Sequence, residues 1–462
     1  MNRPPPSEPP RDARASPSSS ETSTSAGSAS TSVHADIALV LEGTYPYRLG
    51  GVTTWVDGLV RALPALRFGV VHLYAGAAPQ GRCVDVPPNV VWQVDLALPD
   101  DLTSLDPARL AARVPACSLV HALSTGFAGL VAAETKRQRG VPLLLTEHGI
   151  YWHEVEQGAP ELETGLRLLG TDVSGGNPCA SRAGWVEWLK ASAREAYAAA
   201  DAVTTVTEAN RPLQARLGLR DGEVIPNGVH HPDTLAALRP AELRRLHSSA
   251  AAPADLRIGF VGRVTPLKDV HAIVRAFADA LPRLPGARLH LIGPTDDPEY
   301  AASCRRLAGL RGVSDRVHRT GAQPVSPWLR HLDLVVLASR SEAEPLALLE
   351  AMAHGVPVVA PDVGGVRRLV TGGPHPPAGL VLAPPTPTAS GPGRLDAALA
   401  EALVVLGTDP GRRRAMGAAG RARTRGRTVE AVAGRYAAVY RRLVPALGGR
   451  ARGEGSTPSI KR

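Results

Sequence analysis

The chain has 462 residues, which is too long for one ordinary domain, and its 44% hydrophobic and 21% charged residues are typical of a globular protein. No apolar run reaches the length of a membrane-spanning helix, and the N-terminus has prolines and charges where a secretion signal needs an apolar segment, so we expect a cytoplasmic protein. The 4 cysteines stand far apart and outside histidine clusters, which argues against structural zinc and favours reduced thiols.

The net charge of +9 originates at the C-terminal end of the chain. Residues 407–462 contain 13 Arg and 1 Lys against Asp409, Glu430 and Glu454, so the rest of the chain is slightly acidic. Aromatic residues make up only 4% of the sequence, which offers no stacking platform for bases, and we expect no nucleic-acid partner. The basic end is either a solvated helix face or a contact for anionic lipid or polysaccharide.

The first half of the chain begins with a tail and then alternates between strands and helices. Residues 1–34 are mainly Ser, Thr, Pro and Ala, which cannot offset the entropy of ordering, so we expect them to be disordered. The strand patterns that follow are ADIALVLEG, FGVVHLYA, SLVHAL, PLLLTEH and DAVTTVT, and EVIPNGV closes this half. Helices are predicted over GGVTTWVDGLVRAL and over about residues 124–140 and 184–200.

The alternation stops over a polar linker at residues 236–254 and then starts again. The second set of strand patterns is RIGFVG, ARLHLIG, RVHRTG, DLVVLA, PVVA and GLVLA. Helices are predicted at about residues 269–281, 297–311, 346–354, 395–407 and 410–424.

Strands that alternate with helices predict an α/β protein with parallel sheets covered on both faces. The linker divides the chain into two doubly wound, Rossmann-like domains, at residues 35–235 and 255–427. A helix at 428–446 and a disordered basic tail at 447–462 follow. Such sheets bind ligands at the carboxyl ends of their strands, so the cleft between the two domains is the expected site.

A diglycine, Gly50-Gly51, lies between the first strand and the first helix. Glycine lets the backbone approach a ligand closely, and a helix N-terminus favours an anion. The sequence is not GxGxxG, so a nicotinamide dinucleotide is poorly supported. A plain tight turn explains the same residues equally well.

Two cations follow the first strand of the second domain. Arg263 stands directly after the strand, and Lys268 begins the next helix. Two positive charges at the carboxyl end of a strand suit a diphosphate. The alternative is a pair of surface charges.

The segment SEAEPLALLE, residues 341–350, follows the strand DLVVLA. Pro345 is predicted as the first helical residue, where its missing N–H has no cost. The N–H groups of Leu346, Ala347 and Leu348 would then be available to a phosphate or sugar oxygen.

The same segment carries two carboxylates. Glu342 lies in the loop at the mouth of the predicted cleft, and Glu350 lies about one turn inside the helix. A carboxylate can accept hydrogen bonds from two neighbouring hydroxyl groups, which suits a sugar or a ribose. The alternative for Glu350 is a charge on the helix surface, although its neighbours Leu349 and Ala351 disfavour it.

His148 stands at the end of the strand PLLLTEH, before a glycine. A lone histidine is more often structural than catalytic. Its place on the same rim as the diglycine makes it a candidate for the site.

Together these residues resemble glycosyltransferase family 4, which has the GT-B fold. The resemblance depends on the seven-residue spacing between Glu342 and Glu350, on the pair Arg263 and Lys268, and on the diglycine loop. It is closer to the PelF-like subgroup of exopolysaccharide glycosyltransferases and covers about residues 36–446. The segments that carry this closer resemblance are EGTYPYRLGGVTTWV, STGFAGL, LTEHGIY, TEANR, IPNGV and SEAEPLALLEAMAHGVPVVAPDVGG.

The resemblance implies that the second domain binds the donor. Arg263 and Lys268 would hold the diphosphate and stabilise the charge of the leaving group, which is electrostatic catalysis. Glu350 would bind the ribose of the nucleotide, and Glu342 would hold hydroxyl groups of the donor sugar. No metal or other cofactor is expected, since two cations and a helix terminus do this work and no DxD-type motif is evident.

The resemblance also implies roles for the first domain. Gly51 and its neighbouring N–H would touch the phosphates across the cleft, and His148 would contact the donor sugar. Members of the family retain the anomeric configuration. The helix at 428–446 would cross back onto the first domain.

The implied function is a retaining transferase that moves a hexose, with UDP-glucose the donor by analogy, to a saccharide or a small-molecule acceptor. A position at the inner face of the membrane, next to a membrane-bound exporter or an anionic surface, is implied for the basic C-terminus. The chain departs from the subgroup after HGIY, where WHEVEQ and a Gly/Pro-containing stretch extend to Arg182, so the acceptor stays open. Two alternatives are a nucleotide-sugar epimerase and a catalytically silent binding subunit of a polysaccharide export complex. The complete set of donor-side residues favours the transferase.

Overall fold

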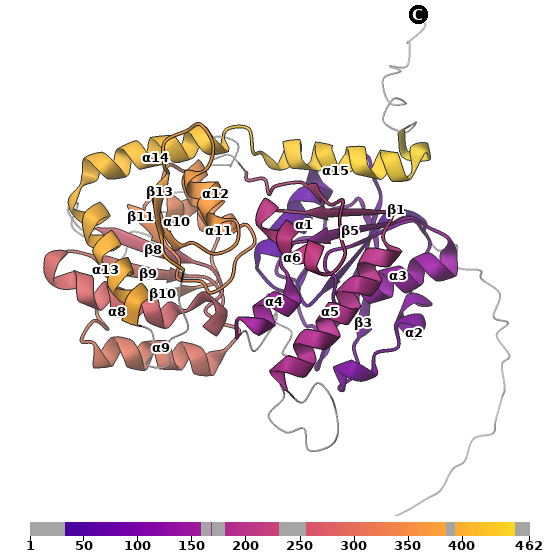
Figure 1. Cartoon of the computed structure of the whole chain (residues 1–462), viewed down its shortest axis with the longest axis horizontal. Helices are drawn as coiled ribbons and strands as arrows, with labels where there is room; N and C mark the ends of the chain where they lie inside the picture. Colours follow the sequence, from indigo (N-terminus) through magenta and orange to yellow (C-terminus); the bar gives the residue numbers. More distant parts are fainter. Residues whose placement is uncertain (1–32, 159–167, 169–180, 231–255, 385–392, 449–462) are drawn as a thin grey trace, which may run out of the picture. The chain divides into compact units, whose positions relative to one another are not determined.

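The computed structural model describes residues 33–158, 168, 181–230, 256–384 and 393–448, all in one compact unit that begins at Val33 (Figure 1). The predicted linker lies outside the described residues, as do all but two residues of each predicted tail. The domain boundaries therefore stay a prediction. None of the helices in the described part combines the length and apolar character needed to cross a membrane.

The N-terminal half forms a seven-stranded parallel sheet with the strand order β3-β2-β1-β4-β5-β6-β7. Its strands are β1 (Ala35–Glu42), β2 (Phe68–Tyr74), β3 (Val90–Ala97), β4 (Cys117–Ala122), β5 (Leu143–Glu147), β6 (Ala202–Thr205) and β7 (Glu223–Val224). All eight residues of β1 are buried, as expected for a central parallel strand covered on both faces. The sequence analysis did not predict β3, because this edge strand is only half-buried and lacks a continuous apolar run.

The C-terminal half forms a six-stranded parallel sheet with the order β10-β9-β8-β11-β12-β13. Its strands are β8 (Arg257–Val261), β9 (Arg288–Ile292), β10 (Val317–Gly321), β11 (Leu334–Val336), β12 (Val358–Pro361) and β13 (Gly379–Leu382). The first strand of each half, β1 or β8, lies in the interior of its sheet. The next two strands are added on one side of it, and the later strands are added on the other side. The prediction of two doubly wound α/β domains is confirmed.

The helices up to α12 lie in the connections between the parallel strands, and α13 to α15 follow the last strand. They are α1 (Gly51–Ala62), α2 (Pro107–Ala111), α3 (Phe127–Arg139), α4 (Tyr151–Glu156), α5 (Arg182–Ala199), α6 (Arg211–Arg216), α8 (Val270–Ala280), α9 (Pro298–Leu310), α10 (Val325–Leu329), α11 (Leu346–Ala353), α12 (Val366–Thr371), α13 (Gly393–Thr408), α14 (Pro410–Thr424) and α15 (Val429–Leu443). The long helices match the predicted ranges within a few residues. The short helices α2, α4, α6, α10 and α12 were not predicted, since one or two turns give too little periodicity.

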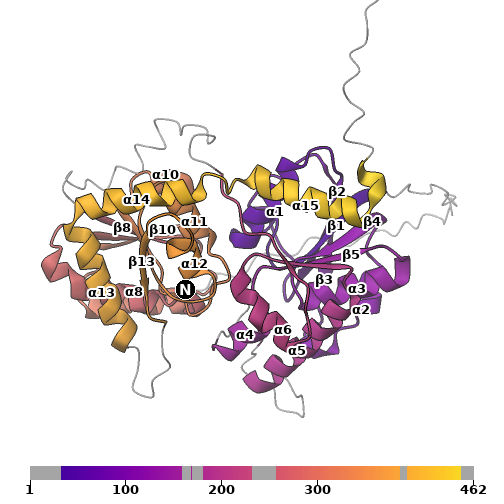
Figure 2. The same ribbon diagram turned by 45° about the horizontal axis from the view of Figure 1, so that its top comes forward.

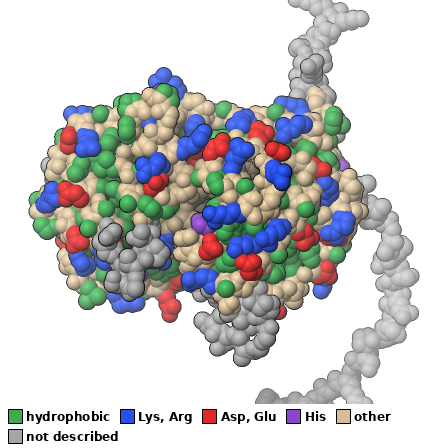
Figure 3. Space-filling model, viewed as in Figure 1, with side chains coloured by type: hydrophobic (Ala, Val, Ile, Leu, Met, Phe, Trp, Pro, Cys, Tyr) green, Lys and Arg blue, Asp and Glu red, His purple; other side chains and the backbone are tan. Residues whose placement is uncertain are grey.

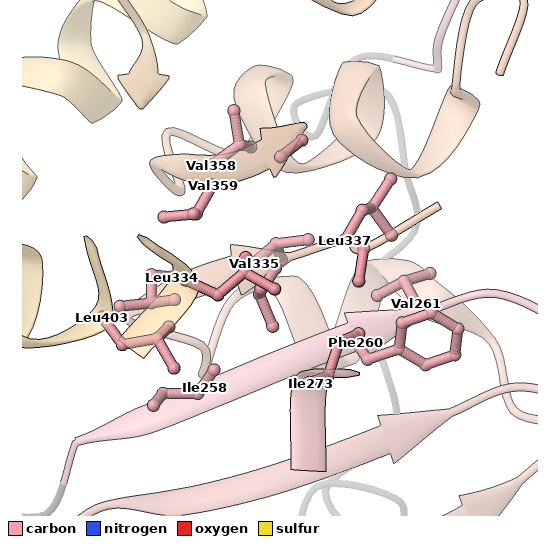
Figure 4. Packing of buried hydrophobic residues seen from close by; sticks show 14 of the residues in the cluster. Ile258, Phe260, Val261, Ile273, Leu334, Val335, Leu337, Val358, Val359 and Leu403 are labelled. Carbon is pink, nitrogen blue, oxygen red and sulfur yellow. The ribbon is translucent and has the colours of Figure 1, made fainter. Parts of the chain in front are cut away.

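Each sheet has its own apolar core. In the C-terminal half, Ile258 of β8, Leu334 of β11 and Leu403 of α13 are completely buried and pack together (Figure 4). The molecular surface seen in Figure 3 differs from these cores, because Lys and Arg side chains are interspersed there with Asp and Glu. The apolar residues thus hold the layers together, and the loops at the strand ends are left to form a site.

The last helix, α15, packs on the N-terminal half although it follows the C-terminal half in sequence. It lies beside α1 in both views (Figures 1 and 2), and its Tyr436 and Tyr440 join the core of the first sheet. Val229 and Thr428 pair as a parallel bridge where the two connecting segments meet. The predicted return of a final helix to the first domain is thus present in the fold.

Candidate active site

A cavity of about 540 Å³ opens at the carboxyl ends of both sheets. Its lining includes all nine site residues that the sequence predicted, which are Gly50, Gly51, His148, Arg263, Lys268, Glu342, Leu346, Ala347 and Glu350. The first three belong to the N-terminal half and the other six to the C-terminal half. Folding therefore brings together residues that are up to 300 positions apart in the sequence.

The diglycine forms the start of α1 at the cavity wall. Gly50 is the N-cap, in extended conformation with φ of 175°, and no side chain caps the helix. A Cβ placed on Gly50 would meet no atom within 4 Å apart from its chain neighbours. The fold itself therefore does not require glycine here, and the open space supports close approach of a ligand over a plain tight turn.

Arg263 and Lys268 are nearly buried, with exposed fractions of 8% and 9%. The guanidinium of Arg263 lies 3.2 Å from a carboxylate oxygen of Asp296, and Lys268 Nζ donates to Glu342 Oε1 at 2.7 Å. The interpretation of these cations as surface charges is wrong. Each one is paired with a carboxylate, and Asp296 was not found from the sequence.

The N-terminus of α11 differs in detail from the prediction. Pro345 is the N-cap rather than the first helical residue, and the helix begins at Leu346. The N–H of Leu348 donates to the carbonyl oxygen of Pro345 at 3.1 Å, so it is not available to a ligand. This hydrogen bond tightens the first turn of the helix. Leu346 and Ala347 are therefore the residues through which the helix N-terminus faces the cavity.

Glu350 lines the cavity from α11, and the alternative of a solvated helix-surface charge is wrong. Its side chain is half-buried. Burial raises the pKa of Glu350 from 4.5 to about 7, since the charged form loses its water. A carboxylate in this state gains from any ligand that donates hydrogen bonds to it.

His148 follows β5 and reaches the cavity from the N-terminal half. Burial lowers the pKa of His148 to about 4, so the imidazole is neutral at physiological pH. Its Nε2 has no hydrogen-bond partner within the described residues. The ring packs against the edge of the Trp55 indole, with centroids 4.6 Å apart.

A cluster of polar residues at the cavity wall was not predicted from the sequence. Glu344 Oε2 accepts a hydrogen bond from the backbone N–H of Asn227 at 2.7 Å and pairs with Arg427 at 2.6 Å. Arg427 also donates to the carbonyl oxygen of Asn227. The cluster joins the loop before α11 to both segments that connect the two halves. The only sequence signal for this cluster was the second glutamate, Glu344, beside Pro345. Arg427 could not be told apart from the other arginines of the basic C-terminal run.

A second cavity of about 930 Å³ adjoins the first, because Glu342 and Ala343 line both. Its other walls are polar and include His153 and Glu154 of α4 and Arg275 of α8. Across the described ranges, no group of three or more His, Cys, Asp or Glu is arranged to hold a metal ion.

Two parts of the chain match known domain families. Residues 255–409 match the family described as glycosyl transferases group 1, and residues 35–109 and 100–221 match a domain of unknown function, DUF3492. The D-inositol 3-phosphate glycosyltransferase of Kribbella flavida is 35% identical over 193 residues, which are 40% of this chain and 43% of that protein. The chain spans less than half the length of the first curated relatives that it matches.

Solved structures of other proteins share the fold. The sucrose-phosphate synthase of Thermosynechococcus elongatus matches with a TM-score of 0.65 and 23% identity, over 89% of this chain and 99% of that one. HepE of Anabaena in complex with UDP and glucose matches with a TM-score of 0.64 and 17% identity, over 88% and 99%. The fold is therefore that of the GT-B glycosyltransferases. Residues 255–409 thus carry a glycosyltransferase group 1 domain.

Proposed function

We propose that the chain is a retaining glycosyltransferase that moves a hexose from a nucleotide sugar to a saccharide or a small-molecule acceptor. The observation that carries the proposal is one cavity in which two buried cations, two helix N-termini and three carboxylates, two of them Glu342 and Glu350, converge. Cations and helix termini suit a diphosphate, and carboxylates suit the hydroxyl groups of a sugar and a ribose. No smaller ligand would use all of these groups.

The diphosphate would bind between Arg263, Lys268 and the N-termini of α1 and α11. Lys268 is paired with Glu342 at 2.7 Å, so its ammonium group would turn partly from the carboxylate to the phosphate. That exchange would release Glu342 to accept hydrogen bonds from the donor sugar. The site would thus prepare its sugar-binding carboxylate only when a diphosphate is present.

Catalysis would then be mainly electrostatic. As the bond between the anomeric carbon and the diphosphate oxygen breaks, its electrons leave with the diphosphate, and Arg263 and Lys268 stabilise that charge. The acceptor oxygen would bond to the anomeric carbon on the same face and pass its proton to the departing diphosphate oxygen. His148 would contact the donor sugar as a neutral imidazole, because its lowered pKa removes a competing charge. The reaction is proposed to need no metal or other cofactor.

UDP-glucose is the proposed donor. The support is the likeness of the fold to HepE, whose structure contains UDP and glucose. The second cavity would take the acceptor, because it meets the first at Glu342, where the donor sugar would lie. Exopolysaccharide synthesis in the cytoplasm, with the basic C-terminus against an exporter or the inner face of the membrane, is the proposed setting.

The first test is thermal denaturation with UDP, GDP, UDP-glucose, UDP-N-acetylglucosamine and GDP-mannose, without added metal. We expect UDP and one UDP-sugar to raise the melting temperature selectively. A rise with the GDP compounds alone would overturn the choice of donor. No rise with any ligand would overturn the nucleotide-sugar site itself.

The second test separates binding from turnover. Lys268→Ala should weaken UDP binding and slow transfer at least about tenfold, because a charge-assisted contact contributes roughly 1.5–3 kcal/mol. Arg412→Ala removes an exposed cation on α14 and is the matched control. Glu342→Gln should abolish turnover while UDP still binds. Unchanged kinetics in both site variants would remove the proposed function, and a wild-type protein that binds UDP-sugars without turnover would be a silent binding subunit.

A further inference from the structure

The ring of His148 is held by packing. No hydrogen bond of its imidazole is found within the described residues, although its Nε2 is enclosed by protein. Histidines at reactive sites commonly have one ring nitrogen fixed by a hydrogen bond, which sets the orientation of the ring. In this protein the neighbouring ring of Trp55, on α1, takes that place, with centroids 4.6 Å apart and planes inclined by 75°.

Trp55 in turn packs against the last helix, α15. The rings of Trp55 and Tyr436 are 5.0 Å apart and inclined by 84°, an edge-to-face arrangement that aromatic pairs favour. Tyr436 is completely buried, and Trp55 has an exposed fraction of 6%. Three aromatic rings, from the loop after β5, from α1 and from α15, therefore form a row of successive contacts that ends at the cavity.

The neighbouring Tyr440 provides a comparison within the same helix. It lies one turn after Tyr436, is equally buried, and bonds through its hydroxyl to His121 at 2.9 Å. It makes ring contacts with His121 and Tyr436, whereas none with Trp55 is found among the described residues. Both tyrosines are buried in the core, but of the two only Tyr436 has a ring contact with Trp55 among the described residues.

We propose that Tyr436 is a positioning residue, which holds Trp55 and thereby sets the orientation of the His148 ring toward the cavity. A helix that belongs in sequence to the donor half would in this way complete the catalytic rim of the other half. The inference depends on the proposed function only for the role of His148 in turnover. The packing itself can be tested without any reaction.

The structural test uses NMR of the full chain labelled at histidine. The His148 signal is identified by its loss in His148→Gln. In Tyr436→Leu we expect a changed chemical shift, as the Trp55 ring moves, and a pKa that rises from about 4 toward 6.5, as water reaches the imidazole. The titratable rings near His148 are His121 and Tyr436, and both are buried. A parallel titration of His121 shows how far its own protonation contributes to the change in the His148 pKa.

Tyr440→Leu is the matched control, because it empties the same kind of space one turn away. We expect it to lower the melting temperature about as much as Tyr436→Leu but to leave the His148 signal in place. Tyr436→Phe keeps the ring and should restore the wild-type signal. If Tyr436→Leu does not fold, Trp55→Phe replaces it and should shift the His148 signal in the same direction.

The kinetic test measures hydrolysis of UDP-glucose, in which water replaces the unknown acceptor and UDP and glucose are formed. Misplacing a reacting group by about 1 Å can cost on the order of a hundredfold, so we expect Tyr436→Leu to lower kcat about tenfold or more with KM nearly unchanged. Equal losses of kcat in Tyr436→Leu and Tyr440→Leu, or a His148 signal that does not move, would overturn the inference. Absence of turnover in the wild type would instead count against the proposed function, and the NMR comparison would then decide the inference alone.

Discussion

Replacing Glu350 by Gln should make the protein more stable at pH 8 but not at pH 5. Burial raises the pKa of this carboxyl group from 4.5 to about 7. The folded protein therefore binds more protons than the unfolded chain between these values, and the free energy of unfolding falls as the pH rises through this window. Gln has nearly the same shape but no charge, so the variant lacks this loss.

The size of the effect follows from the shift. Each pKa unit corresponds to about 1.36 kcal/mol, so the buried charge costs at most about 3 kcal/mol at pH 8 and less than about 1 kcal/mol at pH 5. Water in the adjoining cavity reduces the first figure. We therefore expect Glu350→Gln to gain about 1–2 kcal/mol over the wild type between pH 5 and pH 8.

Urea denaturation at pH 5 and pH 8 measures this difference directly. Glu401→Gln on α13 is the matched control, because that carboxylate is 59% exposed and paired with Arg283 on the surface. The difference in the free energy of unfolding between Glu401→Gln and the wild type should change by less than about 0.5 kcal/mol between the two pH values, as for other surface substitutions. The reasoning is refuted if Glu350→Gln gains no more than this control.

The same carboxyl group should link binding to pH. Ribose hydroxyl groups donate to an ionised carboxylate, so donor binding should release a proton from Glu350 and strengthen as the pH rises from 5 to 8. UDP-glucose is the right probe, because it lacks the terminal phosphate monoester that titrates near about pH 6. Calorimetry in buffers of different ionisation enthalpy counts the proton. Proton release that persists in Glu350→Gln would assign it to another group.

Four other substitutions probe the interface of the two halves and the cavity wall. Arg427→Ala leaves the buried carboxylate of Glu344 without its cation and should lower the free energy of unfolding, measured in urea, by about 3–5 kcal/mol. Glu344→Gln should lower it clearly less. Equal losses in the two variants would show that the pair acts only through packing. Gly50→Ala meets no neighbour within 4 Å and should change stability by less than about 0.5 kcal/mol, but its methyl group enters the cavity and should weaken UDP binding in calorimetry; unchanged affinity would place the ligand elsewhere. A Cβ on Gly365 would lie 2.5 Å from the backbone oxygen of Ala343 and 2.6 Å from Thr207 Oγ1, so Gly365→Ala should cost about 1–3 kcal/mol in the same denaturation assay. An unfolding midpoint equal to that of the wild type would mean that both neighbours move aside without cost.

Much of the fold could be predicted from the sequence, because buried parallel strands and amphipathic helices leave a clear local pattern. The strand ADIALVLEG and the helix that contains Trp55 are examples, and the structure has them as β1 and α1. The pattern fails where a segment is short or half-buried. The edge strand β3 and the one-turn helices have too few apolar contacts to mark their sequences.

The candidate site was predicted for a related reason. Its residues stand directly after strands or at helix starts, and parallel sheets bring those positions to one edge. Position along the chain thus indicated which residues converge, and the structure places all nine in one cavity. It could not indicate their partners, such as Asp296 for Arg263 or Glu342 for Lys268.

The sequence by itself therefore determined the two α/β halves and the residue types that border the cleft between them, since both follow from local periodicity and from strand ends. Only the tertiary structure decided the charge states and supports of the site. The raised pKa of Glu350, the buried trio around Glu344, and the row from Tyr436 through Trp55 to His148 all depend on contacts between distant segments. Desolvation and ring packing are properties of the assembled surroundings of a residue, and its sequence neighbours supply only a small part of those surroundings.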